Sequence, residues 1–511
     1  MRGGSSSMIQ SVSSANSVDP VGQSRGLKSN VVGLLGAATL GVVMLSPAMT
    51  LYGGFGPAFL SAGKAAPLAF VWALIATIPT AISYAVLSRE YPVSGSAASW
   101  ASRAVSPRIG VWAGWMVFFY YFANFIIQPV TLGVFLHDLL VALHVPLSIL
   151  ASYFLGVVVC CAWPAWMVYR GISISAKGAL AFLLCESLVV IALCLTIAFV
   201  APKLGAHFSA DGFKISSSPT GTSGLFKAMV FSMLAYCGFD VVSTLAEETK
   251  MARKLIPQAT LLSLLVYAVL IIGGIWSLTY GADAQVLKAV AEKGEMPIQS
   301  IAQSFWGKGS ILVTVTAVSA SLGLAIATAV GASRVLFAMG REGSASPVFA
   351  RLHSGYQVPW NTLHLIFLGG LGAALVAGIL VGPYNAYVWW CSTSTFFAMI
   401  TYLFVNWANL VLFRDRVFKS ATGFLLYGLV PILGLAADIF ILIRTFFVEL
   451  WSQGWATGQS VIVFDLLCGV LALIFAIRAK RKKPSASVKA TADGDGAMGM
   501  GLDTISADVN T

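Results

Sequence analysis

Twelve stretches of nearly uninterrupted apolar residues constrain the fold of this chain more than any other feature of its sequence. About 20 helical residues cross the hydrocarbon core of a bilayer, and the stretches reach or approach that length. Charged residues make up only 10% of the chain, against about 25% in soluble domains. The sequence therefore predicts an all-α integral membrane protein with 12 transmembrane helices. The stretches lie at about 31–60, 66–87, 109–135, 146–168, 178–200, 225–246, 258–280, 311–337, 362–382, 386–410, 424–447 and 460–478.

Two of these stretches are interrupted near their middle, the first at Ser46-Pro47 and the sixth at Cys237-Gly238. Pro47 lacks an N–H group and disturbs the helix before it. Backbone groups left unpaired at membrane depth persist only where they line a protein-enclosed cavity, so paired breaks point to the binding site of a transporter. We expect substrate contacts at the two breaks from Ser46, Pro47, Ala48, Tyr236, Cys237, Gly238 and Phe239.

The third stretch carries polar side chains at helical spacing, namely Tyr120, Tyr121, Asn124 and Gln128. Residues four apart share one face of a helix, so these groups form a stripe. Such a stripe lines a cavity or bonds to a neighbouring helix, and the sequence leaves both interpretations open. Tyr121 and Asn124 are our further candidates for binding the substrate.

Two acidic residues within the apolar stretches are candidates for proton coupling. Glu186 stands in an otherwise apolar run, where an ionised side chain costs about 2.5 to 3.5 kcal/mol at a helix centre. It would act as a proton carrier, as a counter-ion for a cationic substrate, or as a hydrogen-bonded structural group. Asp240 follows the second break by two residues and would either couple protons or cap the next half-helix.

The placement of positive charge predicts the topology. The net charge is +11, and most of the 31 Lys and Arg residues fall in segments that are cytoplasmic if the N-terminus is inside. The positive-inside rule then places both termini in the cytoplasm. Basic residues at 478–483 would anchor the last helix to anionic membrane lipids, so the charge does not call for nucleic acid. Residues 1–30 lack the apolar core of a signal peptide and, like residues 481–511, are predicted to be disordered cytoplasmic tails.

The sequence gives no sign of catalysis. Its five histidines have no metal-site spacing, and no phosphate-binding loop or nucleophile elbow stands on a suitable element. We therefore expect no metal, no cofactor and no enzymatic activity.

Three segments at the ends of predicted spans carry recognisable motifs. Residues 246–259 include Ala-Glu-Glu-Thr-Lys and Ile-Pro-Gln-Ala, and Gly-Phe-Asp precedes them at 238–240. Residues 334–343 read Arg-Val-Leu-Phe-Ala-Met-Gly-Arg-Glu-Gly, and residues 91–95 read Tyr-Pro-Val-Ser-Gly. Over about residues 31–480, the chain resembles the bacterial amino acid permeases of the amino acid, polyamine and organocation superfamily. It departs from them at residues 44–49, Met-Leu-Ser-Pro-Ala-Met, where relatives have a Gly-Ser-Gly-like stretch that holds the substrate carboxylate.

The resemblance implies a leucine-transporter-like fold with an inverted five-plus-five repeat and broken helices one and six. The transporter domain, 31–480, would consist of repeat one at about 31–200, repeat two at about 225–410, and added helices at about 424–478. By register with the family, Glu186 replaces a lysine that stands in for sodium in some relatives, and Asp240 replaces a glutamate. Tyr236 matches an aromatic residue that closes the site.

These observations predict a secondary active transporter in the cytoplasmic (inner) membrane that imports an amino acid by alternating access, with protons as the coupling ion. The alternatives are a polyamine or other organocation importer, an amino acid exchanger, and a transport-inactive sensor; the oligomeric state is not predicted. Glu247 and Glu248 would form an inner gate with Lys250, Arg253 or Lys254, or remain solvated. Asp438, Arg444 and Asp465 are expected to serve as structural pairs or oligomer contacts.

Overall fold

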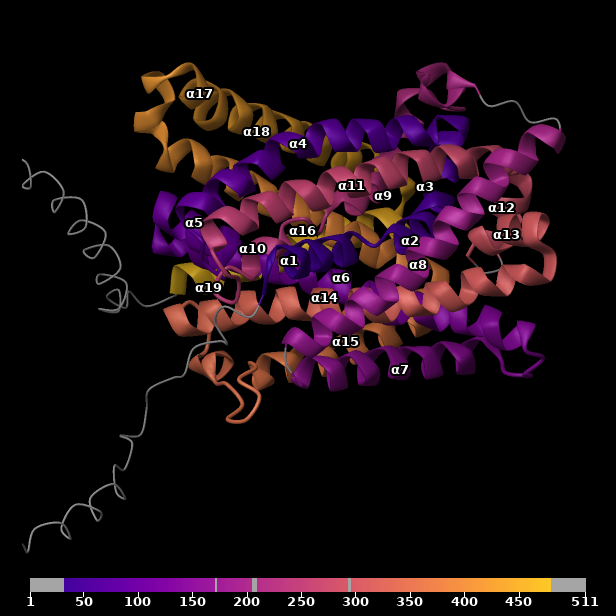
Figure 1. Cartoon of the computed structure of the whole chain (residues 1–511), viewed down its shortest axis with the longest axis horizontal. Helices are drawn as coiled ribbons and strands as arrows, with labels where there is room; N and C mark the ends of the chain where they lie inside the picture. The colour runs from indigo at the N-terminus through magenta and orange to yellow at the C-terminus, as the bar shows by residue number, and fades with distance from the viewer. Residues whose placement is uncertain (1–31, 171, 205–208, 293–295, 479–511) are drawn as a thin grey trace, which may run out of the picture.

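The computed structural model describes residues 32–170, 172–204, 209–292 and 296–478. Within these residues the chain is helical, and its β pairing is a single bridge between Val32 and Thr249. The predicted terminal tails lie outside the described residues. The helices run side by side along the long axis of the bundle (Figure 1). This arrangement agrees with the predicted all-α architecture.

Seven α-helices form the first half of the bundle. The π-helical segment η1 (Thr50–Gly54) joins α2 to α3, so that one continuous helix runs from Pro47 to Ala62. The helices are α1 (Leu34–Leu45), α2 (Pro47–Met49), α3 (Phe55–Ala62), α4 (Ala66–Glu90), α6 (Pro107–Ala142), α7 (Ile149–Tyr169) and α8 (Ile172–Val200).

The second half begins with another interrupted helix. Its helices are α9 (Thr222–Tyr236), α10 (Val241–Thr244), α11 (Ala252–Gly281), α14 (Ile311–Glu342), α15 (Trp360–Val381) and α16 (Pro383–Leu412). α14 and α16 pack against α6 in the middle of the bundle, and α1 contacts α8, α11 and α14. The two halves therefore share one interior, in which the interrupted helices lie.

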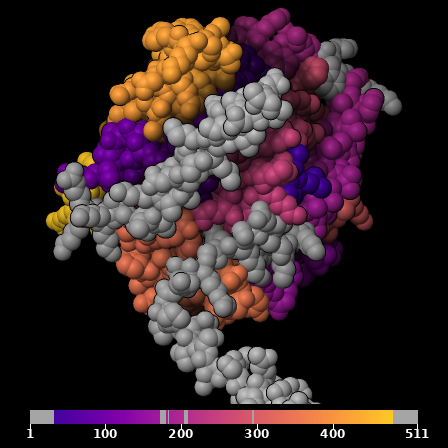
Figure 2. All heavy atoms as spheres, turned by 60° about the vertical axis from the view of Figure 1, so that its left-hand side comes forward, coloured from indigo at the N-terminus to yellow at the C-terminus, as the bar shows by residue number. Residues whose placement is uncertain are grey.

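Short helices connect the long ones at both ends of the bundle. α5 (Ser96–Ala104) lies at one end, and α12 (Ala284–Glu292) and α13 (Ile298–Trp306) lie at the other (Figure 1). In Figure 2 the α5 end faces the viewer, with the violet α5 and the orange segment around α17 (Ala421–Gly423) at its rim.

The C-terminal helices flank this bundle. η9 (Phe424–Leu429), α18 (Val430–Ile441) and η10 (Leu442–Leu450) form one long helical rod with π-helical ends, and α19 (Ser460–Arg478) follows it. α18 packs on α16 and α4, while α19 packs on α6 and α16. These helices cover residues 424–478, and their status as helices added to two five-helix repeats stays a prediction.

Eleven helical stretches of the described chain are long and apolar enough to cross a membrane. One of them, Leu34–Glu90, has 57 residues and contains both the break after α1 and a turn at Gly63, where φ is +58°. A single crossing needs about 20 residues, so this stretch accommodates more than one. The chain is thus a multi-pass membrane protein, and twelve spans remain a prediction.

The first break lies at Ser46, between α1 and α2. Ser46 has φ +39° and ψ 96°, a strained conformation for a residue with a side chain. Its N–H still bonds to the Val42 carbonyl at 2.9 Å, and its Oγ accepts a hydrogen bond from the Met49 N–H at 3.3 Å. The serine therefore ends one half-helix and caps the next.

The second break lies at Cys237 and Gly238, between α9 and α10. Cys237 is extended, and Gly238 has φ +142°, a region that glycine alone adopts readily. A Cβ atom at Gly238 would lie 2.7 Å from Met44 Cγ and 3.0 Å from the Met44 carbonyl carbon. The glycine therefore lets the two breaks touch. The half-helix that follows, α10, has only four residues.

Candidate functional site

A cavity of about 40 Å³ lies between the two breaks. Met44, Leu45, Met49 and Thr50 line it from the first interrupted helix. The lining is completed by Gly54, Asn124, Ile127, Gln128, Phe231, Leu234, Ala235, Cys237, Leu324, Tyr387 and Cys391. Segments far apart in the sequence, α1, η1, α6, α9, α14 and α16, thus surround one small space at the centre of the bundle.

The polar groups of this wall are neutral. Gln128 Nε2 donates to the Asn124 backbone carbonyl at 2.9 Å, while Gln128 Oε1 is buried without a partner. Thr50 Oγ1 and the Tyr267 hydroxyl share a hydrogen bond of 2.5 Å. Among the described residues that line the cavity, none is Asp, Glu, Lys or Arg. The wall can therefore hydrogen-bond a ligand but offers no side-chain charge to it.

Asp240 lies directly after the second break in a cage of tyrosines. Its side chain is fully buried, and Tyr120 and Tyr121 donate their hydroxyls to its two carboxyl oxygens at 3.1 and 2.5 Å. The Tyr402 hydroxyl donates at 3.4 Å, and the Gly238 N–H donates at 3.0 Å. The carboxyl group therefore holds the unwound backbone of the break, rather than capping α10.

Glu186 projects from α8 toward the first break. Only 2% of its surface is exposed, as expected for an acidic residue on an apolar helix. Ser46 Oγ lies 3.5 Å from both carboxyl oxygens and donates to them. The same hydroxyl caps α2 through Met49. Each break thus has one buried carboxyl group bonded to a residue of the break itself.

Tyr236 and Tyr267 connect the cavity wall to the helix behind it. Their rings meet edge to face at 5.9 Å, and Tyr267 bonds to the wall residue Thr50. The Tyr236 hydroxyl is buried without a partner. A rearrangement at either break would therefore move this aromatic pair.

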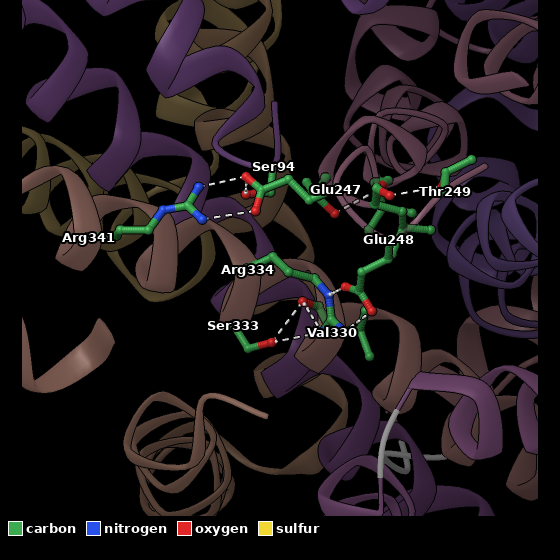
Figure 3. A network of polar contacts seen from close by, with 11 residues as sticks. Ser94, Glu247, Glu248, Thr249, Val330, Ser333, Arg334 and Arg341 are labelled. Carbon is green, nitrogen blue, oxygen red and sulfur yellow. Dashed lines mark hydrogen bonds and ion pairs between the residues drawn. The ribbon is translucent and has the colours of Figure 1, made fainter. Parts of the chain in front are cut away.

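A pair of salt bridges closes one end of the bundle (Figure 3). Arg341 at the end of α14 donates to both Glu247 oxygens, at 2.9 and 2.6 Å, and Ser94 donates to Glu247 at 2.6 Å. Burial alone would raise the pKa of the Glu247 carboxyl, but the hydrogen bonds and charge of Arg341 hold this pKa below its usual value. Glu247 is therefore ionised at neutral pH.

The second salt bridge is almost completely buried. Arg334, also on α14, donates from Nε to Glu248 Oε1 at 2.7 Å and from Nη2 to Oε2 at 3.3 Å. Only 3% of each side chain is exposed. The Val32 N–H bonds to the Glu248 carbonyl at 3.0 Å, which ties the start of the first helix to the same point. We call Glu247, Glu248, Arg334 and Arg341 the latch.

The predicted substrate contacts fall into two groups. Cys237 and Asn124 line the cavity. The others lie around it. Near the second break, Gly238 lies against Met44, Phe239 packs against Tyr84 and Tyr402, Tyr236 packs against Tyr267, and Tyr121 donates a hydrogen bond to Asp240. Near the first break, Ser46 bonds to Glu186, Ala48 is buried within α2, and Pro47 lies beside a separate apolar groove of about 320 Å³ between α8 and α11.

Several residues of the site carried no signal in the sequence. Met44, Met49, Phe231 and Leu324 are ordinary apolar residues, and only the folded arrangement turns them toward the cavity. The gate partners also differ from the expected ones, because Glu247 and Glu248 pair with Arg341 and Arg334. Arg334 could have been recognised, since a cation followed by further apolar residues of the same helix requires a partner.

Within the described parts of the chain, no three His, Cys, Asp or Glu residues come together. Asp438 and Asp465 are fully buried, and Arg444 pairs with Glu449 at 3.1 Å.

The fold resembles that of solved transporter structures. The crystal structure of MhsT in complex with L-phenylalanine superimposes with a TM-score of 0.56 at 15% identity, covering 82% of this chain and all of that chain. MhsT has the leucine-transporter-like fold, so the predicted fold class is confirmed at the level of architecture.

Sequence comparison identifies the family. The chain is 25% identical over 408 residues to the low-affinity putrescine importer PlaP of Escherichia coli (strain K12), covering 78% of this chain and 85% of that protein. It is 26% identical over 336 residues to the branched-chain amino acid permease BcaP of Bacillus subtilis (strain 168), covering 63% and 69%. The family described as amino acid permease matches residues 38–488. The chain belongs to the amino acid permease family and is a secondary transporter.

Proposed function

We propose that this transporter imports a neutral amino acid across the cytoplasmic membrane together with protons. The observation that carries the proposal is the cavity of about 40 Å³ at the contact of the two broken helices. Broken helices at the repeat interface are where transporters of this architecture bind their substrates. The positive-inside distribution of Lys and Arg supports cytoplasmic termini, which makes the latch end the cytoplasmic end.

The wall of the cavity favours a neutral amino acid over a diamine. A diamine such as putrescine, the cargo named for one relative, carries two positive charges, and none of the described residues that line this cavity has a carboxylate. A cation at membrane depth requires a counter-ion. A zwitterion is served instead by helix ends, since the N-terminus of the helix beginning at Pro47 carries partial positive charge and the C-terminus of α1 carries partial negative charge.

Two carboxyl groups supply the coupling. Glu186 bonds to Ser46 at the first break, and Asp240 bonds to the Gly238 N–H at the second. A neutral carboxylic acid is inexpensive to bury, whereas a carboxylate favours the conformation in which water reaches it. Proton uptake at these groups would therefore favour the closed arrangement around the substrate, and proton release would favour opening toward the cytoplasm.

The latch supplies the inward-facing step. Opening toward the cytoplasm must separate the segment after α10 from α14, and this breaks the bonds from Arg341 to Glu247 and from Arg334 to Glu248. The movement also releases Val32 from Glu248. Binding of substrate and protons at the breaks would offset the cost of these separations.

Uptake into proteoliposomes tests the proposal. Labelled neutral amino acids, cationic amino acids and diamines are offered in sodium-free buffer, with and without an imposed inward proton gradient. We expect gradient-stimulated uptake of a neutral amino acid. Preferential uptake of putrescine would establish the diamine importer instead, gradient-independent counterflow would establish an exchanger, and binding without uptake would establish a sensor.

A further inference from the structure

A third buried carboxyl group lies outside the substrate cavity, where α18 meets α4 and α16. Asp438 is fully buried. Thr80 Oγ1 donates to Asp438 Oδ2 at 3.3 Å, and Asn406 Nδ2 donates to the same oxygen at 3.0 Å. Asn406 also donates to Thr80 Oγ1 at 2.7 Å, so the three side chains form one cluster.

This carboxyl group has no counter-charge in the part of the chain that the structure describes. Among the described residues, neither Lys nor Arg forms an ion pair with Asp438. The two arginines on neighbouring segments pair elsewhere, Arg444 with Glu449 and Arg416 with Glu90. An ionised carboxylate without a counter-charge is costly at membrane depth. The titratable and charged groups on the elements packed against α18 are Tyr84, Arg89 and Glu90 on α4, Tyr384, Tyr387, Cys391 and Tyr402 on α16, Tyr427 on η9, and Arg444 and Glu449 on η10.

The cluster adjoins the Asp240 cage through a single helical turn. On α16, Tyr402 donates to Asp240 at 3.4 Å, and Asn406, four residues further, donates to Asp438. Tyr84 of α4 packs against Tyr402 with ring centroids 6.0 Å apart and lies within electrostatic reach of both acids. Tyr84 and Tyr402 therefore stand between the two acids and place them in neighbouring polar clusters.

A line of buried polar groups continues from Asp438 toward the latch end of the bundle. Asn409 Nδ2 donates to Ser83 Oγ at 3.1 Å and to the Leu426 carbonyl at 3.3 Å. Beyond them, Glu90 at the end of α4 pairs with Arg416 at 3.3 Å. We call Thr80, Ser83, Ser88, Asn406 and Asn409 the polar seam.

Four buried oxygen atoms along this seam have no partner in the described protein: Asp438 Oδ1, Asn406 Oδ1, Asn409 Oδ1 and Ser88 Oγ. Buried polar atoms in proteins are satisfied by hydrogen bonds, and where protein supplies none, ordered water or a bound proton does so. Most of these oxygen atoms belong to α4 and α16. Water molecules bound to them would form a chain along which protons pass between water and hydroxyl groups.

We propose that Asp438 is a proton-binding site and that it exchanges its proton with the aqueous phase at the latch end through the polar seam. The carboxyl group gains a proton on one oxygen from water and later returns it, so no other reactant is needed. This inference goes beyond the proposed function, because the substrate cavity, Glu186 and Asp240 can operate without it. It also places a titratable group on an added helix, outside the two five-helix repeats.

Infrared spectroscopy of the purified full-length protein in lipid nanodiscs tests the site without relying on transport. At neutral pH we expect Asp438→Asn to remove the absorption of one protonated carboxylic acid while leaving the ionised carboxylates unchanged. The control is Asp415→Asn, whose side chain is 86% exposed, and it should remove one carboxylate band only. Loss of a carboxylate band in Asp438→Asn would overturn the proposal.

The seam is tested with Asp438 left in place, which also covers the case in which Asp438→Asn does not fold. On transfer to heavy water, the carboxylic acid band assigned to Asp438 shifts as its proton exchanges for deuterium. We expect Asn409→Leu to slow that shift at least several-fold and the control Asn361→Leu, at the exposed start of α15, to leave it unchanged. An exchange rate equal to that of the wild type in Asn409→Leu would overturn the pathway.

Discussion

Ser46 donates a hydrogen bond to Glu186, joining the break in the first helix to a buried acid on α8. The same oxygen accepts the Met49 N–H, so the geometry of the break and the state of the carboxyl group depend on each other. A neutral Glu186 carries an O–H group that requires a hydrogen-bond acceptor, whereas an ionised Glu186 only accepts hydrogen bonds. The relationship explains how a proton at Glu186 would influence the central cavity, although no acidic residue is among the described residues of its wall.

Replacing Glu186 with Gln tests this coupling. Glutamine retains an oxygen that can accept the Ser46 hydrogen bond but cannot release a proton. We expect folded protein whose uptake no longer responds to a proton gradient, measured in proteoliposomes over a range of pH. Uptake by Glu186→Gln with the pH profile of the wild type would remove Glu186 from the coupling mechanism.

Replacing Gly238 with Ala tests the contact between the breaks. The new Cβ would meet Met44 at 2.7 Å, at a backbone φ of +142° that L side chains rarely adopt. We expect a loss of about 1 to 3 kcal/mol in stability and weaker substrate binding, measured by thermal unfolding and by ligand titration. Gly372→Ala on α15, where nothing lies within 4 Å, is the matched control. Wild-type affinity in Gly238→Ala would show that the glycine is dispensable for the site.

The fold was more accessible from the sequence than the site. Apolar length and Lys/Arg placement predict spans and topology because the bilayer imposes both on any chain. The breaks at Ser46 and Gly238 were also visible, since proline and glycine mark interrupted helices directly.

The cavity wall was not visible, because a helix surrounded by apolar residues on every face has no periodicity that tells which face turns inward. Phe231 and Tyr387 resemble the lipid-facing residues around them, yet both line the cavity. The latch pairs Glu248 with Arg334, which lies 86 residues away along the chain. Proximity along the chain instead pointed to Lys250, Arg253 or Lys254, and it carries no information about cations that are brought close only by folding.

Breaking the buried salt bridge of the latch should be costly. Arg334→Met leaves Glu248 buried without a counter-charge, and such a loss costs about 3 to 5 kcal/mol. We expect the double variant Arg334→Met, Glu248→Leu to recover much of this stability, measured by chemical unfolding in detergent. Additive effects of the two single changes would show that the pair is not energetically coupled.

The outer salt bridge of the latch should depend on pH. Because the pKa of Glu247 is lower in the folded protein than in the unfolded chain, its contribution to stability is complete above the unfolded pKa of about 4.3 and is lost as the pH falls through the folded value. We expect wild type to be more stable than Glu247→Gln at neutral pH and the difference to vanish in acid. A difference that is constant with pH would contradict the assigned ionisation of Glu247.

Proton movement driven by substrate tests the central claim most directly. Proteoliposomes containing a pH-sensitive dye are placed in sodium-free buffer at equal pH inside and out, and a transported neutral amino acid is added outside. The account predicts acidification of the interior by the wild type and none by Glu186→Gln. Entry of the labelled amino acid into wild-type vesicles without any change in internal pH would contradict proton coupling.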